Sequence, residues 1–201
     1  MAFLLGDVMG TKPRIRWGAR HVLYLLLLAV LLAFGVTTWI ELKCKTFDFT
    51  PTNWLFLFAT FLAVVGWIIT AIVNLRNSIK QHTINTLLQS RLSTAFNQRT
   101  DDLAAVYPTG KILTESDLTN TDPNNLAALA ALKYFLNHHE FVAVGISHGD
   151  LSHDVLKSSL EGIVVGLYEK AEVYIKARQR EDPQNFEHFV WLYERWKPKG
   201  N

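Results

Sequence analysis

Two long stretches without any charged side chain constrain this sequence more than any other feature. The chain has 201 residues, and it carries no Asp, Glu, Lys or Arg for 20 residues after Arg20 and for 27 residues after Asp48. An apolar helix needs about 20 residues to cross the hydrocarbon core of a bilayer. The sequence therefore predicts two transmembrane helices and a connecting loop, over residues 21–40, 54–75 and 41–53.

A signal peptide is the usual alternative explanation for an apolar stretch near an N-terminus. The first stretch is longer than the roughly 7 to 15 apolar residues of a signal peptide, and no small-x-small cleavage site follows it. Two core helices of a soluble protein are the other alternative, but core helices seldom run this long without charge. We expect a membrane hairpin, with Trp39 and Trp54 at its facing ends in the headgroup layer.

Basic residues flank the two predicted membrane helices on one side of the bilayer. Residues 1–20 form a basic arm with four Lys or Arg and one acid, and Arg76 and Lys80 follow the second helix. Because Lys and Arg next to a membrane helix resist translocation, we expect both termini in the cytoplasm and the loop outside it. The only cysteine, Cys44, lies in this loop, where it could form an intermolecular disulfide or remain a thiol.

The part of the chain after the membrane helices is nearly neutral. Residues 76–201 contain 14 Lys or Arg and 15 Asp or Glu, which gives a net charge of −1. A nucleic-acid-binding domain needs a basic face that neutralises phosphates. We therefore expect no nucleic acid among the partners of this domain.

The residues after the second membrane stretch divide by composition into three parts. Apolar residues continue at spacings of three and four past Arg76, so the second membrane helix is expected to extend into the cytoplasm as a stalk. A segment rich in Pro, Thr, Asp and Asn then predicts a loop. The predicted parts are a stalk helix over 76–100, a loop over 101–125 and a helical domain over 126–201.

Local start and stop signals predict three helices in this domain. Asp122 followed by Pro123 is typical of a helix start, and Gly149 is typical of a helix end. Ser152 predicts the start of the next helix, and Asp182 followed by a proline predicts the start of the last one. We expect an all-α protein in which a two-helix transmembrane hairpin precedes a cytoplasmic helical bundle.

A short pattern in the middle of the domain resembles a known family. The pattern consists of Asn137, Glu140, Gly145 and Gly149 ahead of an amphipathic helix. Over about residues 122–196 the chain resembles a bacterial membrane-anchored family known only as domain-of-unknown-function family 4760. The resemblance implies a helical cytoplasmic domain on an anchor in the bacterial inner membrane, and it implies no catalytic residues.

Part of this pattern also matches a motif of serine hydrolases. Residues 145–149 read G-x-S-x-G, which in α/β-hydrolases places a nucleophilic serine on a turn between a strand and a helix. The candidate catalytic residues are Ser147, His148, Asp154 and His188. The residues before the motif predict a helix, however, where an α/β-hydrolase needs strands. We expect a helix that stops at a glycine, and a membrane-tethered hydrolase remains the alternative function.

The same region is rich in His and carboxylate side chains, which bind zinc and other divalent metals. The candidate metal ligands are His148, Asp150 and His153. Neighbouring residues on a helix point about 100 degrees apart, so His138, His139 and Glu140 cannot all face one ion. We expect neither a metal nor another cofactor. His139 falls on an apolar stripe, which predicts a core histidine bonded to a carbonyl. Glu140 is expected to pair with a Lys or Arg of another helix or to cap a helix end.

Two groups of residues are candidates for interactions with other molecules. Gly35 and Gly66 lie in the membrane stretches and permit close helix contact, so we expect a homo-oligomer. Three aromatic residues near the C-terminus could form a docking face or complete the core: Phe189, Trp191 and Trp196.

These observations predict a function based on binding. We expect a two-pass protein that contacts the lipid bilayer, copies of itself and an unknown cytoplasmic protein. Its domain would serve as a sensor, a scaffold or a membrane effector, for example in bacterial stress or phage defence, although that setting rests only on a common domain layout.

Overall fold

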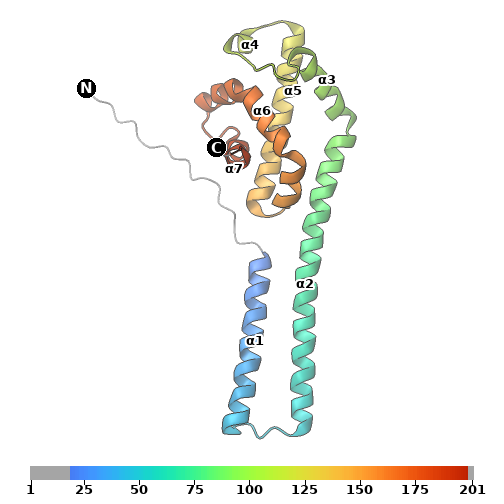
Figure 1. Cartoon of the computed structure of the whole chain (residues 1–201), viewed down its shortest axis with the longest axis vertical. Coiled ribbons are helices and arrows are strands. Elements are labelled where there is room, and N and C mark those ends of the chain that lie inside the picture. The colour runs from blue at the N-terminus through green and yellow to red at the C-terminus, as the bar shows by residue number, and fades with distance from the viewer. Residues whose placement is uncertain (1–18, 199–201) are drawn as a thin grey trace, which may run out of the picture. The chain divides into compact units, whose positions relative to one another are not determined.

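The computed structural model describes residues 19–198, and every regular element in this range is an α-helix (Figure 1). The helices are α1 (Ala19–Cys44), α2 (Pro51–Leu92), α3 (Thr94–Val106), α4 (Glu115–Thr119), α5 (Pro123–His148), α6 (His153–Glu181) and α7 (Glu187–Trp196). The predicted all-α class is therefore confirmed. The described residues form two compact units, over 19–79 and 80–198. The predicted basic arm lies almost wholly outside the described residues.

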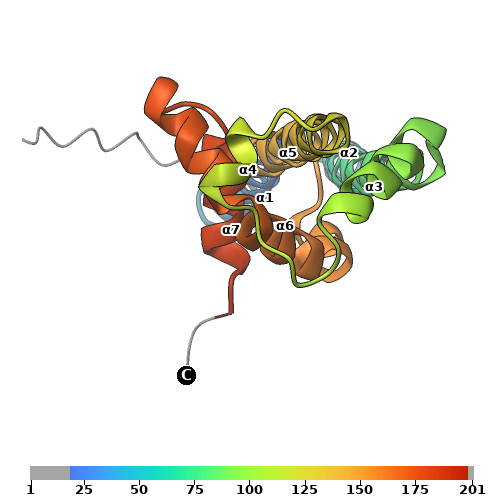
Figure 2. The same cartoon turned by 90° about the horizontal axis from the view of Figure 1, so that it is seen from above.

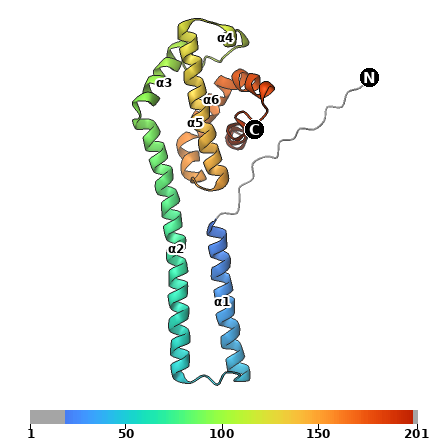
Figure 3. The same cartoon turned by 180° about the vertical axis from the view of Figure 1, so that it is seen from behind.

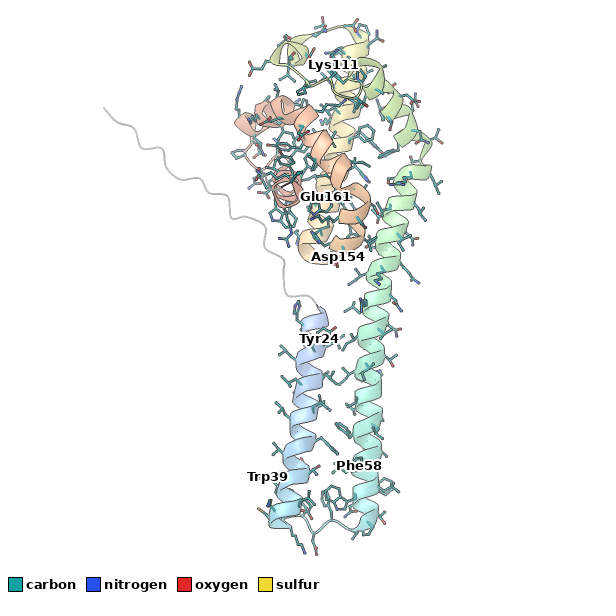
Figure 4. All side chains as sticks on the ribbon, viewed as in Figure 1. Tyr24, Trp39, Phe58, Lys111, Asp154 and Glu161 are labelled. Atoms are coloured by element: carbon teal, nitrogen blue, oxygen red, sulfur yellow. The ribbon has the colours of Figure 1, made fainter. Side chains whose placement is uncertain are left out.

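The first unit is a hairpin made of α1 and the first part of α2. Phe34 of α1 stacks on Phe61 of α2 with ring centroids 3.9 Å apart, and it meets Phe58 edge-on at 5.3 Å. Figure 4 labels Phe58 on α2. The connecting loop is held by Glu41, whose carboxylate accepts hydrogen bonds of 2.8 Å from the backbone N–H groups of Phe47 and Phe49. Glu41 is only 5% exposed, and these two hydrogen bonds give each of its buried carboxylate oxygens a donor.

Both helices of the hairpin are long and apolar enough to cross a membrane. The candidate spans are His21–Cys44 and a window within Pro51–Leu92. Large apolar side chains cover their outer surfaces, among them Trp39 at 63% exposure and Trp67 at 74% (Figure 4). A surface of this kind is stable in lipid and unfavourable in water.

The second half of α2, which we call the stalk, ends earlier than the helix predicted over residues 76–100. α2 ends at Leu92, where the stalk was predicted to reach residue 100. Ser93 interrupts the helix with extended backbone, and its hydroxyl accepts a hydrogen bond from the N–H of Phe96, so it serves as the N-cap of α3. The apolar spacing of three and four continues across Ser93, which is why the sequence pattern did not reveal the break.

The predicted loop over 101–125 contains more helix than expected. α3 extends to Val106, and the five-residue α4 lies inside the range. Tyr107 fastens this segment because it is 1% exposed and its hydroxyl donates a 2.6 Å hydrogen bond to the side-chain oxygen of Asn125. Burial, together with the nearby Asp117, raises the pKa of Tyr107 to about 12. A segment with a loop-like composition is thus tied to the start of α5.

The hydrophobic core of the second unit is built around α5. This helix packs against α3 on one side and α7 on another, and α6 closes the bundle against α7 (Figures 2 and 3). As predicted, α5 starts after Asp122, whose carboxylate accepts from the N–H groups of Asn124 and Asn125. It ends at Gly149, which has a φ of 80°, and Ser152 is the N-cap of α6, also as predicted.

The start of the last helix is where the local sequence signal was wrong. Asp182 and the following proline begin a turn and not a helix, because the Asp182 carboxylate accepts from the N–H of Gln184 within that turn. α7 begins at Glu187, after Phe186 has adopted a left-handed conformation with a φ of 58°. No side chain of this turn caps the helix.

Candidate functional site

The cap of α7 comes from Glu140, a residue of the family-like pattern. One carboxylate oxygen accepts a 2.7 Å hydrogen bond from the N–H of Phe189, and the other accepts from the N–H and the ring Nδ1 of His188, at 3.2 and 3.0 Å. A negative charge at the first turn of a helix is stabilised by the exposed N–H groups and by the helix dipole. The sequence predicted that Glu140 would either pair with a Lys or Arg or cap a helix end, and the structure shows the cap. The side chain that it contacts is His188 and not a Lys or Arg.

The G-x-S-x-G motif does not form a nucleophile elbow. Ser147 lies inside α5, is 2% exposed and donates its hydroxyl hydrogen to the carbonyl of Val144 at 2.8 Å. His148 is next to it, but His188 binds Glu140 and Asp154 is on the surface beside His153. The four candidate catalytic residues are thus not brought together as a triad. The preceding residues are helical, so the strand that the elbow requires is missing from this part of the described chain.

The predicted metal ligands also separate in the fold. Within residues 19–198 no three His, Cys, Asp or Glu side chains lie where they could hold one ion. The Nδ1 atom of His148 is 3.0 Å from the Val144 carbonyl, and Asp150 is exposed. His153 accepts a 3.0 Å hydrogen bond at Nε2 from the indole N–H of Trp196, so its role is to join the start of α6 to the end of α7.

His139 is a core residue. It is 3% exposed, and its Nδ1 atom lies 2.8 Å from the carbonyl oxygen of Phe135. Because a carbonyl only accepts, Nδ1 carries the hydrogen. Burial lowers the pKa of His139 to about 4, so the ring is neutral at physiological pH.

The C-terminal aromatic residues form part of the core and not a docking face. Phe189 is fully buried and Trp196 is 1% exposed. Trp191 is half-buried at the rim, where the guanidinium of Arg195 lies 5.9 Å from its ring. Phe189 and Trp196 therefore complete the core, which is one of the two roles that the sequence left open for them.

The two glycines of the family-like pattern each have a structural reason. A Cβ atom at Gly145 would lie 2.6 Å from a methyl carbon of Leu151, so any other residue there would force the buried Leu151 side chain to move. Gly149 has the positive φ that ends the helix, and the Gly145 carbonyl accepts from the N–H groups of Asp150 and Leu151. Asn137 is exposed on α5, and nothing in the described part of the chain explains why this position is an asparagine.

A cleft that sequence reasoning missed lies between α4, α5 and α6. Its volume is about 390 Å³, and its lining combines an apolar floor with charged groups at the edge. The lining residues are Leu118, Leu129, Ala130, Lys133, Tyr174, Ala177, Arg178 and Glu181. The α6 residues of this lining are far along the sequence from those of α4 and α5, so no local pattern could have revealed the cleft.

The two cationic residues that line this cleft, Arg178 and Lys133, differ in whether they have a partner. Arg178 donates to Glu181 at 2.9 Å and to the hydroxyl of Tyr174 at 3.4 Å, and its guanidinium lies over the Tyr174 ring. Lys133 is exposed and makes no ion pair with any residue between 19 and 198. One of the two cationic groups therefore remains available to an incoming acidic group.

The comparison with protein families agrees with the residues described above. The model of the family described as "Domain of unknown function (DUF4760)" matches residues 57–196. The chain belongs to this family. The match is longer than the predicted 122–196, because the DUF4760 region starts inside α2 and ends with the last residue of α7. No curated protein and no solved structure matches the chain.

Acid should destabilise this DUF4760 domain through His139. The pKa of His139 is about 4 in the folded chain and about 6.5 when unfolded, so the unfolded state binds more protons between these values. The free energy of unfolding should therefore fall as the pH drops from 6.5 to 4, by up to about 1.4 kcal/mol per pH unit from this group. Denaturant unfolding of the full chain in nanodiscs, followed by tryptophan fluorescence, measures it.

Two variants separate this effect from the titration of other groups. His139→Met should lose that part of the pH dependence, whereas His82→Gln, at an exposed position of α2, should keep it. An unchanged acid dependence in His139→Met would show that the buried ring does not set it.

Proposed function

We propose that the chain is a two-pass protein of the bacterial inner membrane with both termini in the cytoplasm. Two helices of sufficient length and apolarity support this location, and the basic residues of the N-terminal arm and of Arg76 and Lys80 support the orientation. In this topology the exposed Cys44 lies outside the cytoplasm. The helical domain faces the cytoplasm, where it is accessible to proteins of the cell interior.

We propose further that the domain acts by binding a cytoplasmic protein, as a sensor, scaffold or membrane effector, and that it does so as an oligomer. The cleft between α4, α5 and α6 is the observation that carries this proposal. Several groups that could have supported hydrolysis are engaged within the fold: Ser147 is buried, His188 binds Glu140 and His153 binds Trp196. The cleft is open to solvent and its Lys133 is unpaired among the described residues.

The chemistry of the cleft indicates the kind of segment it would hold. Leu118, Leu129 and Ala177 offer an apolar floor for one or two aliphatic side chains. Lys133, which makes no ion pair among residues 19–198, offers a charge-assisted hydrogen bond to a carboxylate. An acidic segment that carries an aliphatic anchor, supplied by a cytoplasmic protein, satisfies both features.

Thiol labelling tests the topology. In intact cells an impermeant maleimide should label Cys44, which is exposed and the only cysteine. In a Cys44→Ser, Ser158→Cys variant, the same reagent should label the exposed position of α6 only after the cells are permeabilised, because the domain is cytoplasmic. Prior reduction by an impermeant phosphine controls for oxidised Cys44. Labelling of the Ser158→Cys variant in intact cells would overturn the orientation.

Photo-crosslinking tests the binding function. A photoreactive amino acid placed at Ala177, inside the cleft, should give an adduct with one protein, and the same residue placed at Ser158 on the same helix should not. Lys133→Glu should reduce the adduct roughly tenfold, because reversing a charge at a desolvated pair costs on the order of 1.4 kcal/mol of binding free energy.

The matched control is a charge reversal outside the cleft. Lys157→Glu lies on α6 near an acid, Glu161, and away from the cleft lining, so it should leave the adduct unchanged. Equal adducts from Ala177 and Ser158, or adducts that ignore Lys133→Glu, would show that the cleft does not recognise a partner.

A further inference from the structure

One face of the stalk is apolar and is exposed among the residues that the structure describes, 19–198. Ile84, Leu88 and Leu92 follow one another at intervals of four residues in α2, and they are 47%, 49% and 78% exposed. An adjacent face of the same segment is occupied. Thr83 is fully buried and accepts a 2.8 Å hydrogen bond from the N–H of Ser152, and Leu87 packs against the core of the domain. The stalk therefore has one face bound to its own domain and one bare aliphatic face.

The spacing of the bare face continues upstream along α2. Exposed residues recur at intervals of three and four, and together they form what we call the α2 stripe: Ala59, Ala63, Gly66, Thr70, Val73, Asn77, Gln81, Ile84, Leu88 and Leu92. Such a mixture of threes and fours averages close to the 3.6-residue period, so these residues stay on one side of a straight helix.

The residue types along the α2 stripe change with the surrounding medium. Ala59, Ala63 and Gly66 lie in the candidate membrane span, where helices associate through small residues that let backbones approach. A Cβ atom at Gly66 would meet nothing within 4 Å, so the structure itself does not require a glycine there. Ile84 and Leu88 lie beyond Arg76 and Lys80, where water makes burial of aliphatic side chains favourable. Each section thus has the composition that a helix interface needs in its own medium.

A second copy of the chain is the partner that fits the whole of the α2 stripe. Lipid tails can cover only its membrane section, and a soluble protein can cover only its stalk section. A second α2 running parallel in the same bilayer covers both sections, because the membrane brings identical residues to the same level. The DUF4760 match also begins at residue 57, so it includes α2 and the domain but not α1.

We infer that two copies of this chain associate through their α2 stripes in a parallel arrangement. The inference rests on the proposed self-association and assigns it a surface. Of the two glycines singled out in the sequence, Gly66 belongs to this interface. Gly35, which is on α1, lies outside it.

Cysteine crosslinking in isolated membranes tests the assignment with the full chain. In a Cys44→Ser background, Ile84→Cys and Leu88→Cys should form disulfide-linked dimers rapidly when copper phenanthroline is added as the oxidant. His82→Cys and Gln89→Cys lie on the same stretch of α2 and are equally accessible, but they are off the α2 stripe. These two should react at least about tenfold more slowly, because their sulfur atoms face away from the second helix.

A second pair of variants separates the surface from self-association itself. Gly66→Leu should reduce the dimer fraction of the chain in nanodiscs, measured by mass photometry, whereas Gly35→Leu should not. The α2 interface would be wrong, and self-association would stand, if the wild-type chain is dimeric but the His82→Cys and Gln89→Cys variants crosslink faster than Ile84→Cys and Leu88→Cys. The same conclusion would follow if Gly35→Leu dissociates the dimer and Gly66→Leu does not. A wild-type chain that is monomeric in nanodiscs would overturn both.

Discussion

The carboxylate of Glu140 holds the last helix of the domain in place, and much of the bundle depends on it. α7 has no cap of its own, so its first N–H groups would otherwise lack acceptors. Once Glu140 fixes this end, Phe189 and Trp196 fill the core between α5 and α6. The indole of Trp196 then binds His153 at the start of α6, which links three helices through two polar contacts.

The parts of this fold that could be predicted are those with local causes. Asp122 and Gly149 mark the two ends of α5 because the cap and the left-handed glycine act on neighbouring residues. The start of α7 could not be predicted, since its cap comes from a residue 49 positions before Phe189. Asp182 gave a misleading local signal, because its carboxylate stabilises a turn as readily as a helix start.

The candidate sites also depend on contacts between residues that are distant in the sequence, which a local motif does not reveal. A string such as G-x-S-x-G predicts a reaction only when a strand precedes it, and here Ser147 is inside a helix. The cleft depends on α4, α5 and α6 meeting, and the stalk face is visible only when the exposure of Ile84 and Leu88 is known. The polar and apolar groups of the chain fall into two sets, one that stabilises the domain and one that is accessible to other molecules. The buried His139 and Ser147 and the half-buried Glu140 stabilise the domain, and we propose that the accessible cleft and the α2 stripe bind other chains.

The central claim is that Glu140 holds the last helix of the domain in place, and a stability measurement tests it most directly. Unfolding of the full chain in nanodiscs by denaturant gives the free energy for Glu140→Gln and for Glu169→Gln, an exposed carboxylate on α6. Glu140→Gln should lower the free energy of unfolding by about 1–3 kcal/mol, because a charge-assisted cap is lost. Glu169→Gln should change it by less than about 0.5 kcal/mol. A Glu140→Gln variant as stable as the wild-type chain would contradict the account, because the carboxylate would then be free to serve another purpose.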